Sequence, residues 1–346
     1  MAKIHEKHRG YKELRPYVDM CTRSCHREVR YEGVENIPQD SAVLLAPNHC
    51  AALMDAMVIL ATPVKGGVIC FGARSDIFKN PRVARILRWL RIVPLARERN
   101  GLSEVAKNFE VFDEIIECLD NHVPFCMFSE GTHRAQRGML PIKKGIFRLA
   151  RMAIEKTGKP VYIVPAGIDY EDYYQGQRRV TVRYGEPIDV GAAFAEGAAA
   201  GRPEIETYRQ LAATLRGRDL ALLGLDPDGN PLPNASTFSA QDLQGENPAR
   251  PAAVDGTPAS HTVTRAARPP FWLRVFRIFA VLILFPVFLA CTILSLPIWL
   301  PLWLIMRRMK DKAWTQTVRF GLHLFLPIFI PFHILQERIS NYFAAL

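Results

Sequence analysis

The chain has 346 residues, of which 49% are hydrophobic and 23% are charged. This composition is ordinary for a folded globular protein, and it excludes a mainly disordered chain, a collagen-like repeat and a small disulfide scaffold. The net charge is +10, and residues 271–346, the most apolar part of the chain, carry more than half of it. Basic clusters beside apolar runs favour an anionic membrane surface as the partner, and not nucleic acid.

Strand-like and helix-like patterns alternate over the first 190 residues, with short connections. A polar helix is expected over Tyr11–Arg30. Runs of strand length and composition are found at Val29–Tyr31, Ala42–Ala46, Val68–Gly72, Ile92–Leu95, Pro124–Phe128, Val161–Ala166 and Val180–Tyr184, the last alternating like an edge strand. Helical patterns lie at Leu53–Leu60, Pro81–Leu90, Leu102–Asn121, Gly145–Thr157 and 191–223. This alternation predicts an α/β domain over residues 1–225, with a mostly parallel sheet flanked by helices on both faces.

The composition changes between Asp226 and Pro270, where Pro, Gly, Asn, Ser and Asp dominate with scarcely any apolar periodicity. Such a segment is typical of a flexible linker. Residues 271–346 follow as an expected helical membrane anchor. Within them, Ile278–Met306 holds 29 residues without a charge. A straight helix of that length spans about 43 Å, against a hydrocarbon core of about 30 Å.

Prolines inside this apolar run, Pro286, Pro297 and Pro301, favour a bent helix or a helical hairpin. A hairpin would place the basic cluster at 307–312 on the cytoplasmic side together with the N-terminal domain, in agreement with the positive-inside rule. A second apolar run, Phe320–Leu335, is marginal for spanning. The alternative is a set of buried helices in a soluble domain.

The cysteines are Cys21, Cys25, Cys50, Cys70, Cys118, Cys126 and Cys291. Their odd number and irregular spacing argue against a disulfide framework. Cys21, Cys25 and His26 could hold a metal, but no second ligand pair follows at zinc-site spacing, so no metal site is expected. The N-terminus has no apolar stretch and no secretory signal, so the N-terminal domain is expected in the cytoplasm, where thiols stay reduced.

A histidine and a carboxylate follow the predicted strand at Ala42–Ala46, in the stretch from Pro47 to Asp55. Active sites of α/β sheets lie at such strand ends. A carboxylate that accepts from Nδ1–H of a histidine leaves Nε2 free to take a proton. Six residues on one helix would set His49 and Asp55 about 240° apart, so the two meet only if His49 lies in the loop and Asp55 in the first turns of the helix.

Three further strand ends carry polar residues. Ile92–Arg99 ends in arginines, Phe128–Arg134 contains a carboxylate and a hydroxyl, and Val164–Gly167 ends another strand. Lys143 and Lys144 then enter a helix. Strand ends of a parallel sheet meet at one edge, so these residues predict a site for an anionic substrate with a nucleophilic hydroxyl. Phosphate is the natural anion, because Arg offers a bidentate fork and Lys a point charge.

In this order the motifs resemble those of the glycerolipid acyltransferase family of the 1-acylglycerol-3-phosphate acyltransferase type, over roughly residues 29–190. The family's histidine–aspartate motif is similar to His49 and Asp55, and its phosphate-binding motif to the stretch ending at Arg97. Its F-P-E-G-T-R-S motif is similar to Phe128–Arg134, and its V-P motif to Val164-Pro165. The resemblance implies a glycerol-phosphate acyltransferase-like α/β fold and a role in phospholipid biosynthesis. It also implies acyl-CoA or acyl-carrier protein as donor, no cofactor, and a glycerophosphate or lysophospholipid acceptor.

The resemblance makes His49 and Asp55 the expected catalytic pair. The residues expected to bind substrate are Asn48, Arg97, Glu130, Gly131, Thr132 and Lys144. Backbone N–H groups near Gly131 or Gly145 are candidates for the oxyanion, and Glu130 either braces its turn or orients the acceptor. The chain departs from the family pattern in having five residues and not four between His49 and Asp55, and in carrying Ser129 and His133 in place of the motif's proline and arginine.

Two other classes of function are compatible with parts of the pattern. A non-catalytic, membrane-associated lipid-binding protein could retain the fold, although the intact His–Asp pair favours the enzyme. A serine hydrolase would need a G-x-S-x-G nucleophile elbow, and the sequence has none. We therefore expect a membrane-bound O-acyltransferase with its catalytic domain on the cytoplasmic side.

Overall fold

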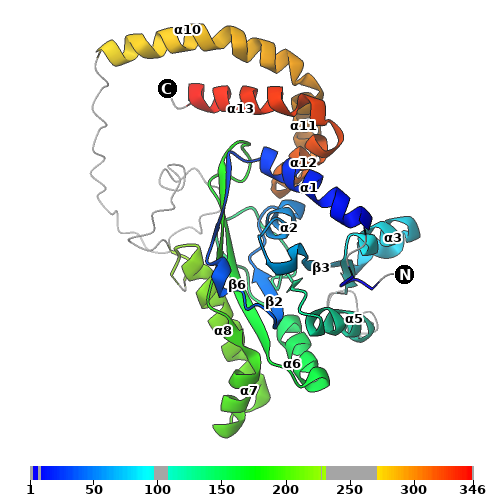
Figure 1. Ribbon diagram of the computed structural model, residues 1–346. Coiled ribbons are helices and arrows are strands. Elements are labelled where there is room, and N and C mark those ends of the chain that lie inside the picture. Colours follow the sequence, from blue (N-terminus) through cyan, green and yellow to red (C-terminus); the bar gives the residue numbers. More distant parts are fainter. Residues whose placement is uncertain (1–2, 7–8, 97–107, 227, 231–270, 345–346) are drawn as a thin grey trace. The chain divides into compact units, whose positions relative to one another are not determined.

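The computed structural model describes residues 3–6, 9–96, 108–226, 228–230 and 271–344 (Figure 1). The chain divides into two compact units, Met1–Thr237 with Asp311–Phe320, and Phe238–Lys310 with Gly321–Leu346. The first unit therefore takes a short stretch from the region predicted as an anchor. Arg97 and nearly all of the predicted linker lie outside the described residues.

An eight-stranded sheet forms the centre of the first unit. Its strands are β1 (Glu28–Glu32), β2 (Ala42–Pro47), β3 (Cys70–Arg74), β4 (Ile92–Leu95), β5 (Phe125–Cys126), β6 (Val161–Tyr170), β7 (Arg179–Tyr184) and β8 (Ile188–Asp189). Their order is β1-β7-β6-β2-β5-β3-β4, with β8 paired to β6. Neighbours are parallel except for the pairs that β6 makes with β7 and β8. The predicted α/β fold with a mostly parallel sheet is confirmed.

Helices cover this sheet. Those described in the first unit are α1 (Arg9–Ser24), α2 (Leu53–Leu60), α3 (Pro81–Trp89), α5 (Asn108–Asp120), α6 (Gly145–Thr157), α7 (Val190–Ala199) and α8 (Glu204–Leu222). The central strand β2 is buried along its whole length, as expected for a strand covered on both faces. Its residues Ala42, Leu44 and Ala46 join a core formed with side chains of α5, α6 and α8. The intervening Val43 and Leu45 face the opposite side.

Several elements differ from the sequence-based expectations. The helix predicted over Tyr11–Arg30 ends at Ser24, because Glu28–Glu32 pairs in parallel register with β7. The strand β7 lies between β1 and β6 and is not at an edge. Its polar positions alternate because they face carboxylates of β1: Arg183 Nε lies 2.8 Å from Glu32 Oε2. The predicted helix at 191–223 is two helices, α7 and α8, separated at 200–203.

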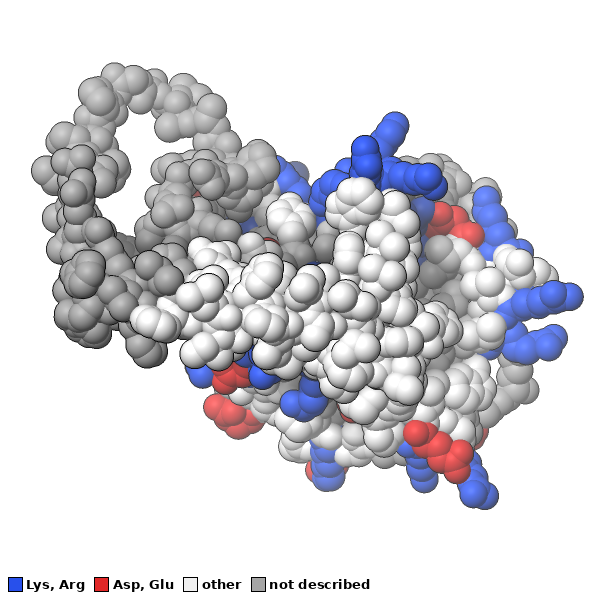
Figure 2. Space-filling view, turned by 90° about the horizontal axis from the view of Figure 1, so that it is seen from above, with Lys and Arg blue, Asp and Glu red and all other residues white. Residues whose placement is uncertain are grey.

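The second unit contains the apolar helices α10 (Phe271–Leu294), α11 (Leu296–Arg308) and α13 (Ile330–Ala344), and α12 (Thr315–Phe325) enters it from the first unit. α10 packs against α13. Side chains on the described part of α10 are uncharged and widely exposed: Phe279, Leu282 and Ile283 are between 60% and 69% exposed. Figure 2, which looks down on this helix, shows an uncharged surface over it.

Among the described residues, no helix by itself has both the length and the apolar character needed to cross a membrane. Two helix pairs meet these requirements jointly, each bent at a short break. They are Val281–Leu294 with Leu296–Arg308, bent by 74°, and Lys312–Phe325 with Pro327–Ala344, bent by 105°. The first bend falls at Ser295, two residues before Pro297, whereas Pro286 and Pro301 lie inside helices. The run predicted as a hairpin is therefore bent, but its axis does not reverse.

Candidate active site

The predicted histidine and carboxylate meet at the C-terminal end of β2. His49 lies in the loop after the strand, and Asp55 lies in the first turn of α2. His49 Nδ1 is 2.7 Å from Asp55 Oδ2. The Asp55 side chain is fully buried, while that of His49 is 17% exposed. The pair thus has the loop-and-helix arrangement that its spacing requires, with one ring nitrogen of His49 bound and the ring partly open.

Asp55 is anchored by more than the histidine. Its Oδ2 also accepts the backbone N–H groups of Cys50 and Ala51, each at 2.7 Å, and its Oδ1 accepts the hydroxyl of Tyr170 at 3.0 Å. A carboxylate can only accept in these bonds. The arrangement therefore assigns the Nδ1 proton to His49 as a donor and leaves Nε2 for proton transfer.

The extra residue between His49 and Asp55 is accommodated in a tight turn. The N–H of Met54 donates to the carbonyl of Ala51 at 3.1 Å. Ala52 between them has φ +51° and ψ −124°, which matches the first central position of a type II′ turn. Glycine is favoured at positive φ because a Cβ atom is strained there. The backbone is therefore strained at Ala52, and the turn places Asp55 within hydrogen-bond distance of His49.

The loop after β5 fixes the backbone of His49. The Glu130 carboxylate accepts the backbone N–H of His49 at 3.0 Å, and the backbone N–H of Arg134 donates to the carbonyl of His49 at 3.1 Å. Glu130 is 4% exposed. Burial raises the pKa of Glu130 to about 8, against the lowering effect of the backbone N–H groups of His49 and Leu140. Glu130 therefore has the contacts of a bracing residue, in line with one of its two predicted roles.

Aromatic rings flank the imidazole of His49. The ring of Phe128 stacks on it with centroids 4.1 Å apart and planes 24° apart. The ring of His133 meets it edge-on, with centroids 5.3 Å apart and planes 71° apart. Both residues belong to the motif stretch at 128–134. These contacts restrict the tilt of the imidazole, which its bond to Asp55 alone would not do.

A protein nucleophile is not evident in this loop. Cys50 follows His49 directly, but its side chain is buried, and burial together with Asp55 raises the pKa of its thiol well above the usual range. The thiolate is the reactive form of cysteine, so Cys50 is poorly suited to attack. The site can withdraw a proton but supplies no activated nucleophile from these residues, which fits a nucleophilic hydroxyl carried by the substrate.

The predicted substrate-binding residues have different environments. Asn48 is buried, and its amide pairs with β6: Oδ1 accepts from Ile168 N at 2.7 Å, and Nδ2 donates to Ile168 O at 3.1 Å. This pairing favours a bracing role over the predicted substrate contact. Thr132 and Lys144 are exposed, and Lys144 directly precedes α6 without a side-chain hydrogen bond that caps the helix. Gly131 has φ +71°, and its N–H donates to Phe128 O at 3.1 Å.

Sequence reasoning missed three contributors. Tyr170, which binds Asp55, lies at the end of β6, beyond the stretch Val164–Gly167 that the sequence analysis selects. The strand was predicted to end at Ala166, and continuing its register would have placed Tyr170 near this edge. Asp311 and Trp314 contact His133 from far along the chain, and no local signal points to them.

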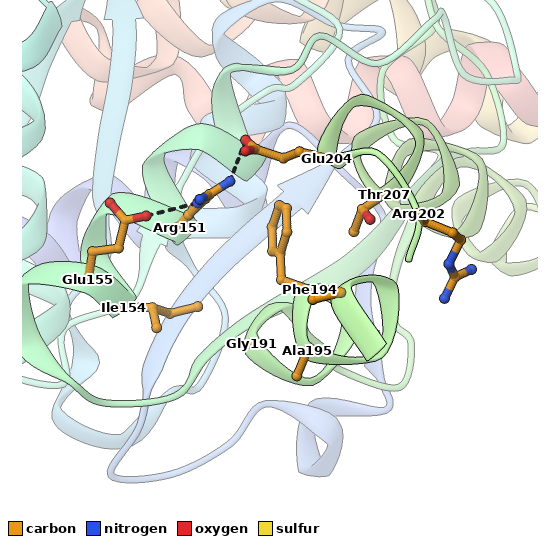
Figure 3. Close-up of a pocket in the computed structure, with 10 residues that line it drawn as sticks. Arg151, Ile154, Glu155, Gly191, Phe194, Ala195, Arg202, Glu204 and Thr207 are labelled. Carbon is orange, nitrogen blue, oxygen red and sulfur yellow. Dashed lines mark hydrogen bonds and ion pairs between the residues drawn. The ribbon is translucent and has the colours of Figure 1, made fainter. Parts of the chain in front are cut away.

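A separate cavity of about 420 Å³ lies between α6, α7 and α8 (Figure 3). None of the predicted site residues lines it. The guanidinium of Arg151 there pairs with Glu155 at 2.8 Å and with Glu204, and it lies 5.2 Å from the ring centroid of Phe194. Because Arg151 is already paired with two carboxylates, the cavity offers little net attraction for an anionic substrate.

Comparison with known proteins bears on the region around His49. The acyltransferase family model matches residues 28–169. Glycerol-3-phosphate O-acyltransferase 2 of Saccharomyces cerevisiae is 32% identical over 96 residues, which are 27% of this chain and 13% of the yeast protein. The chain thus spans only a small part of that relative. The crystal structure of the 1-acyl-sn-glycerophosphate (LPA) acyltransferase PlsC from Thermotoga maritima is 25% identical with a TM-score of 0.42, covering 63% of this chain and 83% of that one.

Residues 28–169 are therefore an acyltransferase domain. The resemblance to glycerolipid acyltransferases that was inferred from the four ordered motifs is confirmed over this range. All the described residues that position the His49–Asp55 pair lie in the matched range except Tyr170, which follows it directly, and the stretch at 311–320.

Proposed function

We propose that this protein transfers a fatty acyl group from an acyl thioester, acyl-CoA or acyl-carrier protein, to a hydroxyl of a glycerophosphate or lysophospholipid acceptor in phospholipid biosynthesis. The observation that carries the proposal is the geometry of His49 and Asp55. A buried carboxylate bound to Nδ1 at 2.7 Å makes Nε2 a base, and the neighbouring thiol is unsuited to act as nucleophile.

In the proposed reaction, His49 Nε2 takes the proton of the acceptor hydroxyl as its oxygen attacks the thioester carbonyl carbon. The tetrahedral intermediate collapses with cleavage of the C–S bond, and the proton passes from His49 to the leaving thiol. Asp55 stabilises the imidazolium that forms between these steps. A positioned general base contributes about 10²–10⁴-fold to such a rate, and no bound cofactor takes part.

The oxyanion of the intermediate needs hydrogen-bond donors. The N–H of Gly131 already donates to Phe128 O, so it is the weaker of the two predicted candidates. The first N–H groups of a helix have no partner within the helix, and α6 begins at Gly145 directly after the site loop. We therefore favour the start of α6 as the donor of these hydrogen bonds.

Positive side chains would hold the phosphate of the acceptor. Arg134, Lys143 and Lys144 are exposed on the loop that contacts His49 and at its junction with α6. Arg97, which follows β4, is the further candidate from the sequence. The raised pKa of Glu130 supports this assignment, because a protonated carboxyl does not repel an anionic acceptor.

We infer further that the second unit attaches the protein to a phospholipid membrane, with the catalytic domain on the cytoplasmic side. Support comes from the exposed apolar side chains of α10 and from the basic residues Arg307, Arg308 and Lys310 at the end of α11. Basic residues beside an apolar helix are attracted to anionic head groups. Lipid acceptors held in the bilayer would then be close to the enzyme that uses them.

Incubation of the purified protein with labelled acyl-CoA or acyl-carrier protein and a panel of acceptors tests the proposal. The panel comprises glycerol 3-phosphate, lysophosphatidic acid and other lysophospholipids. Labelled product should form with the wild type and be lost in His49→Ala. His122→Ala is a matched control, since His122 is an exposed histidine at the opposite end of β5. Acceptor binding without transfer would identify a non-catalytic lipid-binding protein instead.

A further inference from the structure

The stretch Asp311–Phe320, which we call the strap, belongs to the same compact unit as His49 although it lies far beyond the matched acyltransferase domain. It reaches the turn between His49 and Asp55. The hydroxyl of Thr317 donates to Ala51 O at 3.2 Å and accepts the N–H of Met54 at 3.3 Å. These are the two ends of the tight turn described above, so Thr317 fastens the strap to the loop that carries the candidate base.

Buried polar contacts fasten the other side of the strap. Gln316 and Arg319 are 0% and 3% exposed. Gln316 Nε2 donates to Gln175 O at 2.9 Å, and Arg319 Nη1 donates to Gln316 Oε1 at 2.7 Å. Arg319 Nη2 also donates to Tyr174 O at 3.3 Å. Burying a guanidinium is costly unless it is paired, so these satisfied contacts indicate a specific docking position.

The beginning of the strap holds His133. Asp311 Oδ2 is 2.8 Å from His133 Nε2. The indole of Trp314 meets the His133 ring edge-on, with centroids 5.8 Å apart and planes 81° apart. The ring of His133 also contacts that of His49, whose own ring stacks on Phe128. A continuous row of rings therefore runs from the strap to the candidate base.

We propose that the strap completes the active site, with His133 as a positioning residue that Asp311 and Trp314 hold against the imidazole of His49. This inference rests on the acyl-transfer function proposed above. Asp55 fixes one nitrogen of His49, whereas Phe128 and His133 fix the plane of the ring. Misplacement of a reacting group by about 1 Å can cost about 10²-fold in rate, so loosening His133 should slow the chemical step and leave substrate affinity nearly unchanged.

The strap also connects the two units covalently. α12 begins inside it at Thr315 and continues to Phe325, within the second unit. One helix thus carries both the contacts of Thr317 to the active-site loop and residues 321–325 of the second unit. An acyltransferase that takes its acceptor from a bilayer would in this way share an element between its active site and its membrane-binding part.

The first test is a double-mutant cycle in the full-length protein, with Asp311→Ala, His133→Ala and the double variant. Asp311→Ala should lower kcat about 10-fold or more with less than a twofold change in acyl-donor KM, and the double variant should be no slower than His133→Ala alone. Asp311→Glu should restore part of the rate. Asp228→Ala is the matched control, because Asp228 is an exposed aspartate of the same unit. Asp311→Ala within twofold of wild-type kcat, or additive effects in the cycle, would overturn the proposal.

A second measurement does not depend on acyl transfer. Diethyl pyrocarbonate modifies unprotonated imidazole, and mass spectrometry of the peptide containing His49 gives its rate of modification. That rate should rise several-fold in Asp311→Ala and in Trp314→Ala, and stay unchanged in Asp228→Ala. An unchanged rate at His49 in both strap variants would refute the positioning role. If the rate of modification of His49 rises in the strap variants but the wild-type protein transfers no acyl group, the positioning role of the strap stands and the proposed function is rejected.

Discussion

Replacement of Asp55 by Asn separates the charge of this residue from its hydrogen bonds. Oδ2 of Asp55 accepts three donors, from His49 Nδ1 and from the backbone of Cys50 and Ala51, whereas Oδ1 accepts the Tyr170 hydroxyl. An amide NH₂ at the Oδ2 position would oppose three donors. The introduced asparagine should therefore keep its carbonyl oxygen there and turn its NH₂ toward Tyr170, whose hydroxyl can rotate to accept.

In that orientation the Nδ1–H of His49 still has an acceptor, so the tautomer is preserved and the main loss is the negative charge beside the imidazolium. Opposite charges about 4 Å apart attract by about 4 kcal/mol at an effective dielectric constant of about 20. Since about 1.4 kcal/mol corresponds to tenfold in rate, Asp55→Asn should lower kcat by about 10²–10³-fold. This is a smaller loss than for His49→Ala.

The assay is the initial rate of acyl transfer at saturating donor and acceptor, normalised to folded protein. Tyr170→Phe is the control for the orientation of the amide group in Asp55→Asn. Alone it should have a modest effect, but combined with Asp55→Asn it removes the acceptor of the amide NH₂, and the double variant should be slower than the product of the two single effects. A kcat for Asp55→Asn within fivefold of the wild type would refute the charge argument, and a kcat equal to that of His49→Ala would show that the tautomer is lost.

Four other changes have expected outcomes. His49→Ala should lower kcat by about 10³-fold or more with an unchanged melting temperature by circular dichroism; retained activity would remove His49 as the base. Ala52→Gly should raise the free energy of unfolding in urea by about 1 kcal/mol, because φ is +51° there; a destabilised variant would contradict the strain. Burial raises the pKa of Glu130 from an ordinary 4.5 to about 8, so the folded state binds the proton of this carboxyl more tightly than the unfolded state does. The protonated carboxyl therefore contributes to the stability of the fold fully below pH 4.5, and this contribution is lost as the pH rises through about 8. Glu130→Gln should abolish that loss, and parallel pH profiles of the two proteins would refute it. Arg97→Ala should raise the acceptor KM most for phosphate-bearing acceptors; a change confined to the donor KM would reassign Arg97 to the donor.

Much of the fold follows from local patterns. The bounds of β4, α2 and α6 agree with the sequence-based prediction, because each is an apolar or amphipathic run limited by a change in composition. Errors arise where pairing between distant segments decides the outcome. Pairing with β7 ends α1 early and extends β6 from Ala166 to Tyr170. β7 itself resembles an edge strand because its arginines face the carboxylates of β1, which the pattern of one strand cannot reveal.

In the candidate site, too, contacts between residues close in the sequence are easier to predict than contacts between distant segments. The proposed proton-transfer pair is local: His49 and Asp55 are six residues apart, and their contact requires the loop-and-helix arrangement that the structure has. Asn48 was assigned to substrate from its place beside His49, but its amide pairs with the backbone of β6, a contact that depends on the strand order. Residue type and spacing thus predict the contact between His49 and Asp55 better than they predict the backbone contacts of Asn48.

The departure at His133 has a physical explanation that its own motif does not contain. The ring of His133 contacts those of His49 and Trp314, and its Nε2 lies 2.8 Å from the carboxylate of Asp311, 178 residues further along the chain. His133, Asp311 and Trp314 therefore form one contact cluster, which joins a loop of the acyltransferase domain to a segment outside that domain. A family pattern confined to residues 28–169 contains His133 but not Asp311 or Trp314, so the departure at His133 can be understood only together with contacts that lie outside the pattern.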